Sequence, residues 1–207
     1  DPHSSSAYSA SKGLGEQAVL KAFPEAVILR PSVIFGPEDQ FFNRFAAMAR
    51  LGPVLPVVGA RTRFQPVYVD DVAAAAEKAL KGEAAPGIYE LGGPEVKRFD
   101  DIMCDMLEII HRDKVLVIGL PLGLAAVMGG VLDVTQRLSQ ELFVNTVLTR
   151  DQVRNLGRDN VVGEGAKGFA DLGITPTAMA SVLPEYLWRF RPAGQFDEAR
   201  NAASGGR

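Results

Sequence analysis

Apolar residues recur at helical spacing in residues 9–23 and 99–112, which predicts an amphipathic helix in each stretch. An alanine-rich stretch, residues 71–81, predicts a third helix. Between them, residues 27–29 form a short, wholly apolar run, which is typical of a parallel strand covered on both faces. Residues 87–91 predict another short strand, which the glycines and proline after it bring to a turn. The pattern therefore predicts helices that alternate with short strands.

The stretch between the first strand and the alanine-rich helix contains further elements. Residues 39–50 predict a helix, and residues 51–59 are apolar but interrupted by prolines. Residues 61–69 predict an edge strand, because such strands tolerate proline. Asp70 has the side chain of a good N-cap for the helix over residues 71–81, and Asp71 suits its first turn. Capping accounts for both aspartates without a catalytic role.

Residues 115–132 contain no charged side chain, and this length reaches the lower limit for a membrane span. Glycines and a proline interrupt the run, so a spanning helix is not expected. We expect a short extended piece over residues 115–118, then a turn and a helix from about Pro121. Burial against the domain is the favoured interpretation. A surface that lies against a membrane or a large partner is the alternative.

The end of the chain carries several helix signals. Residues 149–152 form a capping-box signature that predicts a short helix. Thr175 and Pro176 predict the N-cap and first position of the last helix, and Pro184 should kink or divide it. After Pro192 the chain has little apolar content, which is typical of a disordered tail.

The composition bounds the function. The chain has 207 residues, of which 47% are hydrophobic and 23% charged, so it can bury a substantial core. A net charge of −3 argues against a general nucleic-acid binder, which needs a basic surface. Cys104 is the single cysteine, and His3 and His111 are the only histidines. A metal site and a Ser/His/Asp triad are therefore poorly supported.

The start of the chain reads as a loop that enters a helix. It has no initiator Met, and Ser4, Ser5 and Ser6 supply possible N-caps just before Tyr8. We therefore expect that an N-terminal part precedes Asp1, which makes the lack of a visible signal peptide uninformative.

Tyr8 and Lys12 are the candidate chemical pair. Residues four apart share one face of a helix, so a phenol and an ammonium would lie side by side. A nearby cation favours the phenolate form of a tyrosine, which suits proton transfer to or from a carbonyl or alcohol. The ammonium can also donate hydrogen bonds to the hydroxyls of a ribose. Taken alone, this spacing is more often a solvated helix face.

The context of the pair carries a family resemblance. After the Tyr-x-x-x-Lys helix come Arg-Pro-Ser-Val-Ile-Phe-Gly at residues 30–36, Gln-Pro-Val-Tyr-Val-Asp-Asp-Val at 65–72 and Ile-Tyr-Glu-Leu-Gly-Gly-Pro at 88–94. This order resembles the extended short-chain dehydrogenase/reductase family, which includes NAD-dependent epimerases and dehydratases. The resemblance covers most of residues 1–112. It implies an α/β fold: the C-terminal portion of an NAD(P)-binding, Rossmann-type doubly wound domain, followed by a small, mainly helical region.

The resemblance also implies the site. In the family the Tyr-x-x-x-Lys pair is catalytic and holds the cofactor ribose, so both roles carry over to Tyr8 and Lys12. The segment after the next strand passes beside the nicotinamide, which implies cofactor contacts for Pro31, Ser32, Val33 and Ile34. An ordinary strand-to-helix turn is the alternative for that segment. Substrate contacts are implied for Asn43, Arg63, Gln65 and Tyr68, although Asn43 could instead only cap its helix.

The family's glycine-rich turn, which takes the cofactor pyrophosphate, has no counterpart in the chain, and neither does the catalytic Ser or Thr upstream of the Tyr. We expect NADP(H) or NAD(H) as the cofactor of a full-length protein, and weak or absent binding by these 207 residues. The domains we expect are residues 1–114 for the Rossmann-like part, 115–191 for the mainly helical region and 192–207 for the tail.

Two stretches of the second half, residues 148–162 and 183–192, narrow the resemblance. They resemble the nucleotide-binding accessory subunits of respiratory complex I, which keep the reductase fold without established turnover. This branch implies complex I subunits as partners and a cytoplasmic location, peripheral on the inner membrane. The alternative is a free-standing NAD(P)-dependent epimerase, dehydratase or reductase, a homodimer that acts on a nucleotide sugar or similar carbonyl compound. A stand-alone NAD(P)-sensing scaffold is a third interpretation.

Overall fold

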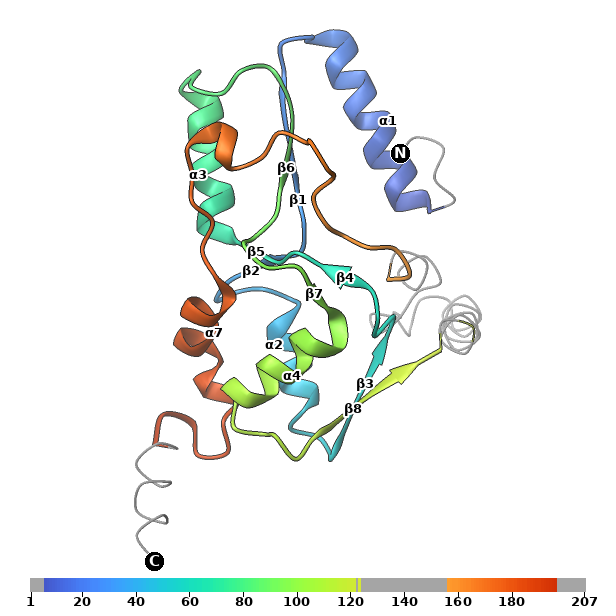
Figure 1. Cartoon of the computed structure of the whole chain (residues 1–207), viewed down its shortest axis with the longest axis vertical. Helices are drawn as coiled ribbons and strands as arrows, with labels where there is room; N and C mark the ends of the chain where they lie inside the picture. The colour runs from blue at the N-terminus through green and yellow to red at the C-terminus, as the bar shows by residue number, and fades with distance from the viewer. Residues whose placement is uncertain (1–5, 122, 124–155, 197–207) are drawn as a thin grey trace, which may run out of the picture.

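The computed structural model describes residues 6–121, 123 and 156–196 (Figure 1). Helices and short strands alternate through residue 120, and the last part of the chain returns over them. The α-helices and strands are α1 (Ala7–Ala22), β1 (Val27–Pro31), β2 (Ile34–Phe35), α2 (Phe42–Met48), β3 (Val54–Val58), β4 (Arg63–Phe64), β5 (Val67–Tyr68), α3 (Val69–Leu80), β6 (Gly87–Leu91), β7 (Lys97–Arg98), α4 (Phe99–Ile109), β8 (Leu116–Leu120) and α7 (Met179–Leu187). Short 3₁₀ turns lie at η1 (Ala170–Leu172), η2 (Trp188–Phe190) and η3 (Gly194–Phe196).

The strands associate in pairs, and most pairs in the described ranges are parallel. β1 pairs with β6, β2 with β5 and β3 with β8 in parallel, while β4 and β7 are antiparallel. Parallel neighbours need a crossover connection, which the intervening helices supply. The predicted α/β class and its parallel strands are therefore confirmed.

Two apolar clusters hold these layers together. The larger one gathers α2, α4 and α7 around Leu55 and Val57 of β3, and Phe35, Phe42 and Phe99 are fully buried within it. The smaller one packs α3 against β1 and β6, and Tyr89 is buried within it. Residues far apart in the sequence thus meet in one core, because Leu183 and Leu187 of α7 belong to the same cluster as Phe35 and Phe42.

The first helix begins as predicted. Ser6 is the N-cap of α1, and its hydroxyl accepts a hydrogen bond of 3.2 Å from the backbone N–H of Ser9. Its large apolar residues Leu14 and Val19, however, are exposed, and so is Phe23 at its C-cap. The strand that follows is parallel as predicted, but its side chains are only half-buried.

The predicted edge strand over residues 61–69 is wrong as a single element. It is divided into β4 and β5, because Pro66 has no N–H to donate and interrupts the ladder. Val69 already belongs to α3, whose N-cap position is Tyr68. Asp70 therefore lies in the first turn of the helix, where its charge suits the dipole, and the N-cap prediction is wrong.

The last helix begins later than predicted. α7 starts at Met179 after Ala178, so Thr175 and Pro176 lie in the preceding loop. Asp71 holds that loop, because its carboxylate accepts bonds from the backbone N–H of Thr177 at 2.6 Å and from its hydroxyl at 3.0 Å. Pro184 does not divide α7, which continues through Leu187 before it tightens into η2.

Residues 115–118 were expected to be extended, and β8 occupies residues 116–120. Leu116 and Ile118 of this strand are exposed rather than buried. The helix expected from about Pro121, the capping box at residues 149–152 and most of the expected tail lie outside the described residues. The domain boundary at residue 114 stays a prediction.

Candidate functional site

Tyr8 and Lys12 lie side by side on α1. The Lys12 ammonium is 5.7 Å from the centroid of the Tyr8 ring, within the range of a cation–π contact. Both side chains are exposed to solvent. The helix therefore presents a phenol and an ammonium together at its first turns, as the spacing predicted.

An ion pair holds α1 against β1. Arg30 Nη2 lies 2.5 Å from Glu16 Oε2, and Arg30 Nε donates to Glu16 Oε1 at 3.0 Å. This hydrogen bonding lowers the pKa of Glu16. Because Tyr8, Lys12 and Glu16 are spaced four apart, they form one stripe of the helix. The face of α1 that Arg30 holds against β1 is therefore the face that carries Tyr8 and Lys12.

The carboxyl end of β1 lies next along the chain, and it is firmly tied. The backbone N–H of Ser32 donates to Leu91 O at 2.9 Å, and its hydroxyl donates to Asn160 O at 2.8 Å. Val33 O accepts from the N–H of Val67 at 2.9 Å, and Ile34 is exposed at the rim. In Figure 1, α1 and β1 run in opposite directions, so α1 begins toward the end of the molecule at which β1 ends.

Gln65 bridges two loops at this edge. Its amide nitrogen donates to Gly93 O at 2.8 Å, and its amide oxygen accepts from the N–H of Val162 at 3.0 Å. Asn160 O accepts from the backbone N–H of Gln65 as well as from Ser32. Gln65 is therefore connected to the predicted cofactor segment through one carbonyl.

Arg63 and Tyr68 each have an acidic partner. The Arg63 guanidinium lies 2.8 Å from Asp159 Oδ2, and its backbone N–H donates to Asp159 Oδ1 at 2.8 Å. These bonds lower the pKa of Asp159, the backbone bond most of all. The Tyr68 hydroxyl donates to Asp70 Oδ2 at 2.8 Å, and this bond raises the pKa of Tyr68.

Asn43 belongs to a separate network, between the β2–α2 connection and the end of α7. Its amide nitrogen donates to Pro37 O and Asp39 O, and its amide oxygen accepts from Arg189 at 2.7 Å. Asp39 accepts from the Tyr186 hydroxyl at 2.5 Å and from the N–H groups of Gly36 and Asn43. Burial, followed by the bond to Asp39, raises the pKa of Tyr186. Asp39, rather than Asn43, satisfies the helix start.

Sequence reasoning missed two elements of this arrangement. Asn160 acts through its backbone carbonyl, which any residue could supply, so no side-chain signal marks it. The contact of Asp39 with Tyr186 joins residues 147 positions apart, and no local pattern reveals such a separation.

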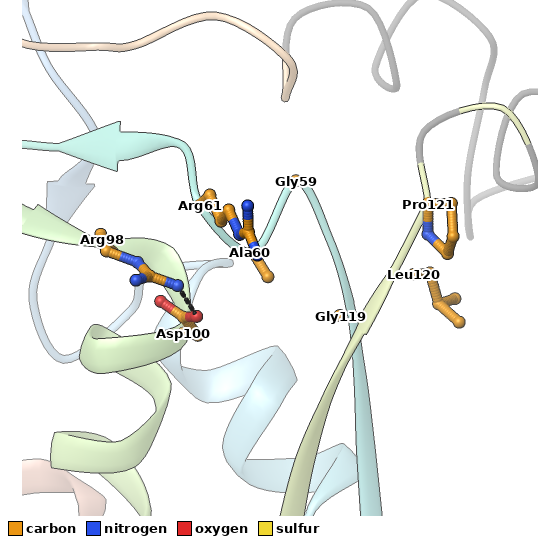
Figure 2. A pocket seen from close by; sticks show the side chains of 8 residues that line it. All are labelled: Gly59, Ala60, Arg61, Arg98, Asp100, Gly119, Leu120 and Pro121. Atoms are coloured by element: carbon orange, nitrogen blue, oxygen red, sulfur yellow. Dashed lines mark hydrogen bonds and ion pairs between the residues drawn. The ribbon is translucent and has the colours of Figure 1, made fainter.

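A hollow of about 500 Å³ opens at the carboxyl ends of β3 and β8 (Figure 2). Two arginines, Arg61 and Arg98, stand on its wall, and Arg98 is paired with Asp100. The remaining lining residues are small or apolar: Gly59, Ala60, Gly119, Leu120 and Pro121. Ligands of open α/β sheets collect at such strand ends, and the arginines favour an anionic group. No group of residues that could hold a metal ion occurs in the described ranges.

Comparison with known proteins gives a family and a fold. The sequence profile of the RmlD substrate binding domain family matches residues 1–115. The chain is 35% identical over 89% of its length to the mitochondrial NADH dehydrogenase [ubiquinone] 1 alpha subcomplex subunit 9 of Arabidopsis thaliana, and covers 46% of that protein. It is 30% identical over 95% of its length to the mitochondrial NADH-ubiquinone oxidoreductase 40 kDa subunit of Neurospora crassa, and covers 50% of it. The chain thus spans about half the length of these curated relatives.

Among solved structures, the dTDP-glucose 4,6-dehydratase of Bacillus anthracis in complex with NAD superimposes with a TM-score of 0.56 at 15% identity, over 93% of this chain and 51% of that one. This likeness shows the Rossmann-like fold that the sequence predicted. Because the family profile matches more than half of the chain, the protein belongs to the RmlD substrate binding domain family, with a short-chain dehydrogenase/reductase-like fold.

Proposed function

We propose that the chain is part of an NAD(P)H-holding accessory subunit of a respiratory NADH:ubiquinone oxidoreductase. One observation carries this proposal. The family profile ends at residue 115, whereas similarity to the plant and fungal subunits extends over about nine-tenths of the chain. The region after residue 115, which the family profile does not cover, is thus similar in sequence to these subunits as well.

The residues present fit one side of a dinucleotide. Lys12 would hold the ribose hydroxyls, and Ser32 to Ile34 would line the nicotinamide. This fit is supported by the fixed stripe of α1 and by the tied carboxyl end of β1. NADP(H) and NAD(H) both have the ribose and nicotinamide that these residues would contact, and the reduced form of either would supply a hydride when bound. The pyrophosphate side needs a helix N-terminus with a glycine-rich turn, which is not among these 207 residues.

Holding rather than turnover is supported by the residues expected to touch substrate. The polar groups of Asn43, Gln65 and Tyr68 all bond to other residues of the chain. Arg63 is likewise paired with Asp159. A substrate would have to break these bonds before it could use them, which weakens the case for substrate binding.

The location follows from the same proposal. A subunit of this kind would be peripheral on the cytoplasmic face of the inner membrane, with complex I subunits as partners. Within the described ranges, no helix has the length and apolarity that a membrane crossing requires.

The test is to purify the native protein from membranes and to ask whether it co-migrates with NADH:ubiquinone oxidoreductase activity and retains nicotinamide dinucleotide. We expect a Lys12→Met variant to co-migrate but to lose the dinucleotide, since it removes the ribose donor alone. Lys21→Met, on the same helix, is the matched control and should keep both. Absence of the protein from the membrane fraction that contains NADH:ubiquinone oxidoreductase activity would contradict the proposal.

A second candidate is an NAD(P)-dependent epimerase, dehydratase or reductase, a homodimer acting on a nucleotide sugar or similar carbonyl compound. It is favoured by the intact pair, in which Tyr8 would be the acid/base, and by the arginine-lined hollow at the ends of β3 and β8. In that case the native protein should turn over such a substrate, and Tyr8→Phe should abolish turnover while dinucleotide binding persists. Turnover unaffected by Tyr8→Phe would exclude this role.

A further inference from the structure

The β3–β8 pair has one face in the core and one face in solvent. Leu55 and Val57 of β3 point inward and are buried. Their neighbours alternate outward, so Val54 and Pro56 of β3 stand beside Leu116 and Ile118 of β8, their partners in the parallel register. In Figure 1 the two strands run together at the lower right, with α2 and α4 on one side of them.

This outward face is apolar. Leu116 is 61% exposed, Val54 41% and Ile118 40%, and Leu51, just before β3, is 87% exposed. Parallel strands are normally covered on both faces, and neighbouring exposed aliphatic residues mark an interaction site more often than scattered ones do. We therefore expect a partner with an apolar surface or interior to cover these exposed aliphatic side chains.

Basic residues stand where the two strands begin. Arg50 precedes Leu51, and Lys114 comes two residues before Leu116; both are exposed. The N–H of Leu116 donates to Pro53 O at 2.8 Å, so the two strand starts lie at the same end of the pair. Asp113 is the acidic neighbour. A chain with a net charge of −3 thus gathers cations at the edge of its exposed aliphatic face.

The only tryptophan of the chain is brought to the same end. Arg112, at the end of α4, donates to Phe190 O at 3.1 Å, and Arg191 donates to Ile109 O at 3.0 Å. These two bonds fix the η2 turn beside the connection that leads into β8, and Trp188 within that turn is 39% exposed. Tryptophan is enriched where protein meets the headgroup region of a bilayer.

We propose that the outer β3–β8 surface, which we define as Arg50, Leu51, Val54, Lys114, Leu116 and Ile118, docks on an anionic phospholipid bilayer. The aliphatic side chains enter the boundary between headgroups and acyl chains, and Arg50 and Lys114 contact lipid phosphates. A protein partner could cover the aliphatic side chains alone. The added cations and the neighbouring tryptophan favour a bilayer. This docking uses none of the residues assigned to the cofactor, so it stands or fails independently of dinucleotide binding.

Trp188, in the η2 turn next to the connection that leads into β8, is the fluorescent probe for docking. We expect its fluorescence to shift to the blue, and to be quenched by lipids with brominated chains, when the 207-residue chain meets vesicles of phosphatidylcholine mixed with phosphatidylglycerol. Vesicles of phosphatidylcholine alone should give a much weaker response, and added salt should reverse binding. Co-sedimentation with the same vesicles measures the partition constant.

Variants test the surface itself. Leu116→Asp should abolish co-sedimentation, and Arg50→Glu or Lys114→Glu should each lower the partition constant for anionic vesicles by at least about fivefold. Two control variants lie away from the surface: Leu80→Asp alters an exposed leucine of α3, and Lys21→Glu alters an exposed lysine of α1. Both variants should bind vesicles as the unaltered chain does. Circular dichroism confirms that each variant is folded.

Three outcomes would overturn the proposal. The first is equal binding to neutral and anionic vesicles, and the second is no binding to either. The third is a self-associated chain, detected by light scattering, that Leu116→Asp converts to a monomer without any effect on vesicles. In that third case the face is an interface with another copy of the chain.

Discussion

At the scale of single residues, the contact between Asp39 and Tyr186 connects the start of α2 with α7. Tyr186 is buried, and Asp39 accepts its hydroxyl together with two backbone N–H groups. We expect Asp39→Ala to lower the free energy of unfolding by about 2–3 kcal/mol, because it leaves a buried hydroxyl and a helix start without an acceptor. Tyr186→Phe removes only one of three donors and should cost about 1 kcal/mol. Urea denaturation measures both.

The exposed neighbour Glu38 supplies the control for this pair of variants, and Glu38→Ala should change stability by less than about 0.5 kcal/mol. Equal losses for Asp39→Ala and Tyr186→Phe would contradict the assignment of Asp39 as the shared acceptor.

The Glu16–Arg30 pair predicts a pH dependence. The pKa of Glu16 is lowered in the folded protein by the Arg30 hydrogen bond, so the folded state holds its proton less tightly than the unfolded state. The stabilisation is therefore complete above the unfolded pKa of about 4.3 and is lost as the pH falls through the lower, folded value. Arg30 is substantially exposed, so we expect only about 0.5–1 kcal/mol.

Glu16→Gln isolates this contribution. The difference in unfolding free energy between the unaltered chain and the variant should be present at pH 7 and should disappear as the pH falls below the lowered pKa of Glu16. A difference that stays constant with pH would mean that the pair contributes through packing rather than charge.

At the residue scale, the sequence predicted the features that depend on the spacing of nearby residues. The four-residue interval predicted that Tyr8 and Lys12 share a face, and Ser6 was among three candidate N-caps. It could not find Asn160, whose backbone carbonyl joins Ser32 and Gln65, because that contact depends on tertiary approach. The roles assigned to these residues in binding stay predictions.

At the scale of elements, the turn after β6 depends on glycine. A Cβ on Gly93 would lie 1.9 Å from Pro66 O, so the connections after β6 and β4 approach too closely for any side chain. We expect Gly93→Ala to lower the unfolding free energy by about 1–3 kcal/mol, as overpacking does. Thermal denaturation checks this.

Gly15→Ala is the matched control with the opposite sign. Gly15 lies inside α1, and a Cβ there meets nothing within 4 Å. The change should therefore stabilise the chain by about 0.5–1 kcal/mol through helix propensity. If Gly93→Ala were as harmless as Gly15→Ala, the close approach would not be a constraint.

Two helix boundaries were predicted correctly from the residues next to them. Pro24 ended the first helix near its predicted limit, and Phe99 opened α4 as predicted. The last helix was misplaced because Asp71 binds Thr177 and holds residues 175–177 in a loop. An acidic residue more than a hundred positions away thus overrode a local start signal.

At the scale of the whole molecule, the described strands pair two by two, and part of the apolar helix surface is uncovered. Within the described ranges β1 pairs with β6 alone, and the apolar residues of α1 face solvent. Sequence periodicity could predict that these surfaces are apolar, but not whether anything covers them, since coverage depends on atoms far along the chain or outside it.

Dinucleotide affinity is the property that tests this view of the molecule. The chain supplies the candidate ribose and nicotinamide contacts without a glycine-rich turn, so the strongest phosphate-binding device is missing from it. We expect the 207-residue chain to show no saturable binding when NADPH fluorescence is titrated, whereas the native protein isolated from membranes retains the dinucleotide. Lys12→Met should leave the titration of the chain unchanged. The opposite result would be binding of NADPH by the chain at micromolar concentrations that Lys12→Met weakens. In that case Tyr8, Lys12 and the segment after β1 would suffice to hold the cofactor. The contacts of the pyrophosphate would then contribute far less to the binding free energy than helix-terminus electrostatics imply.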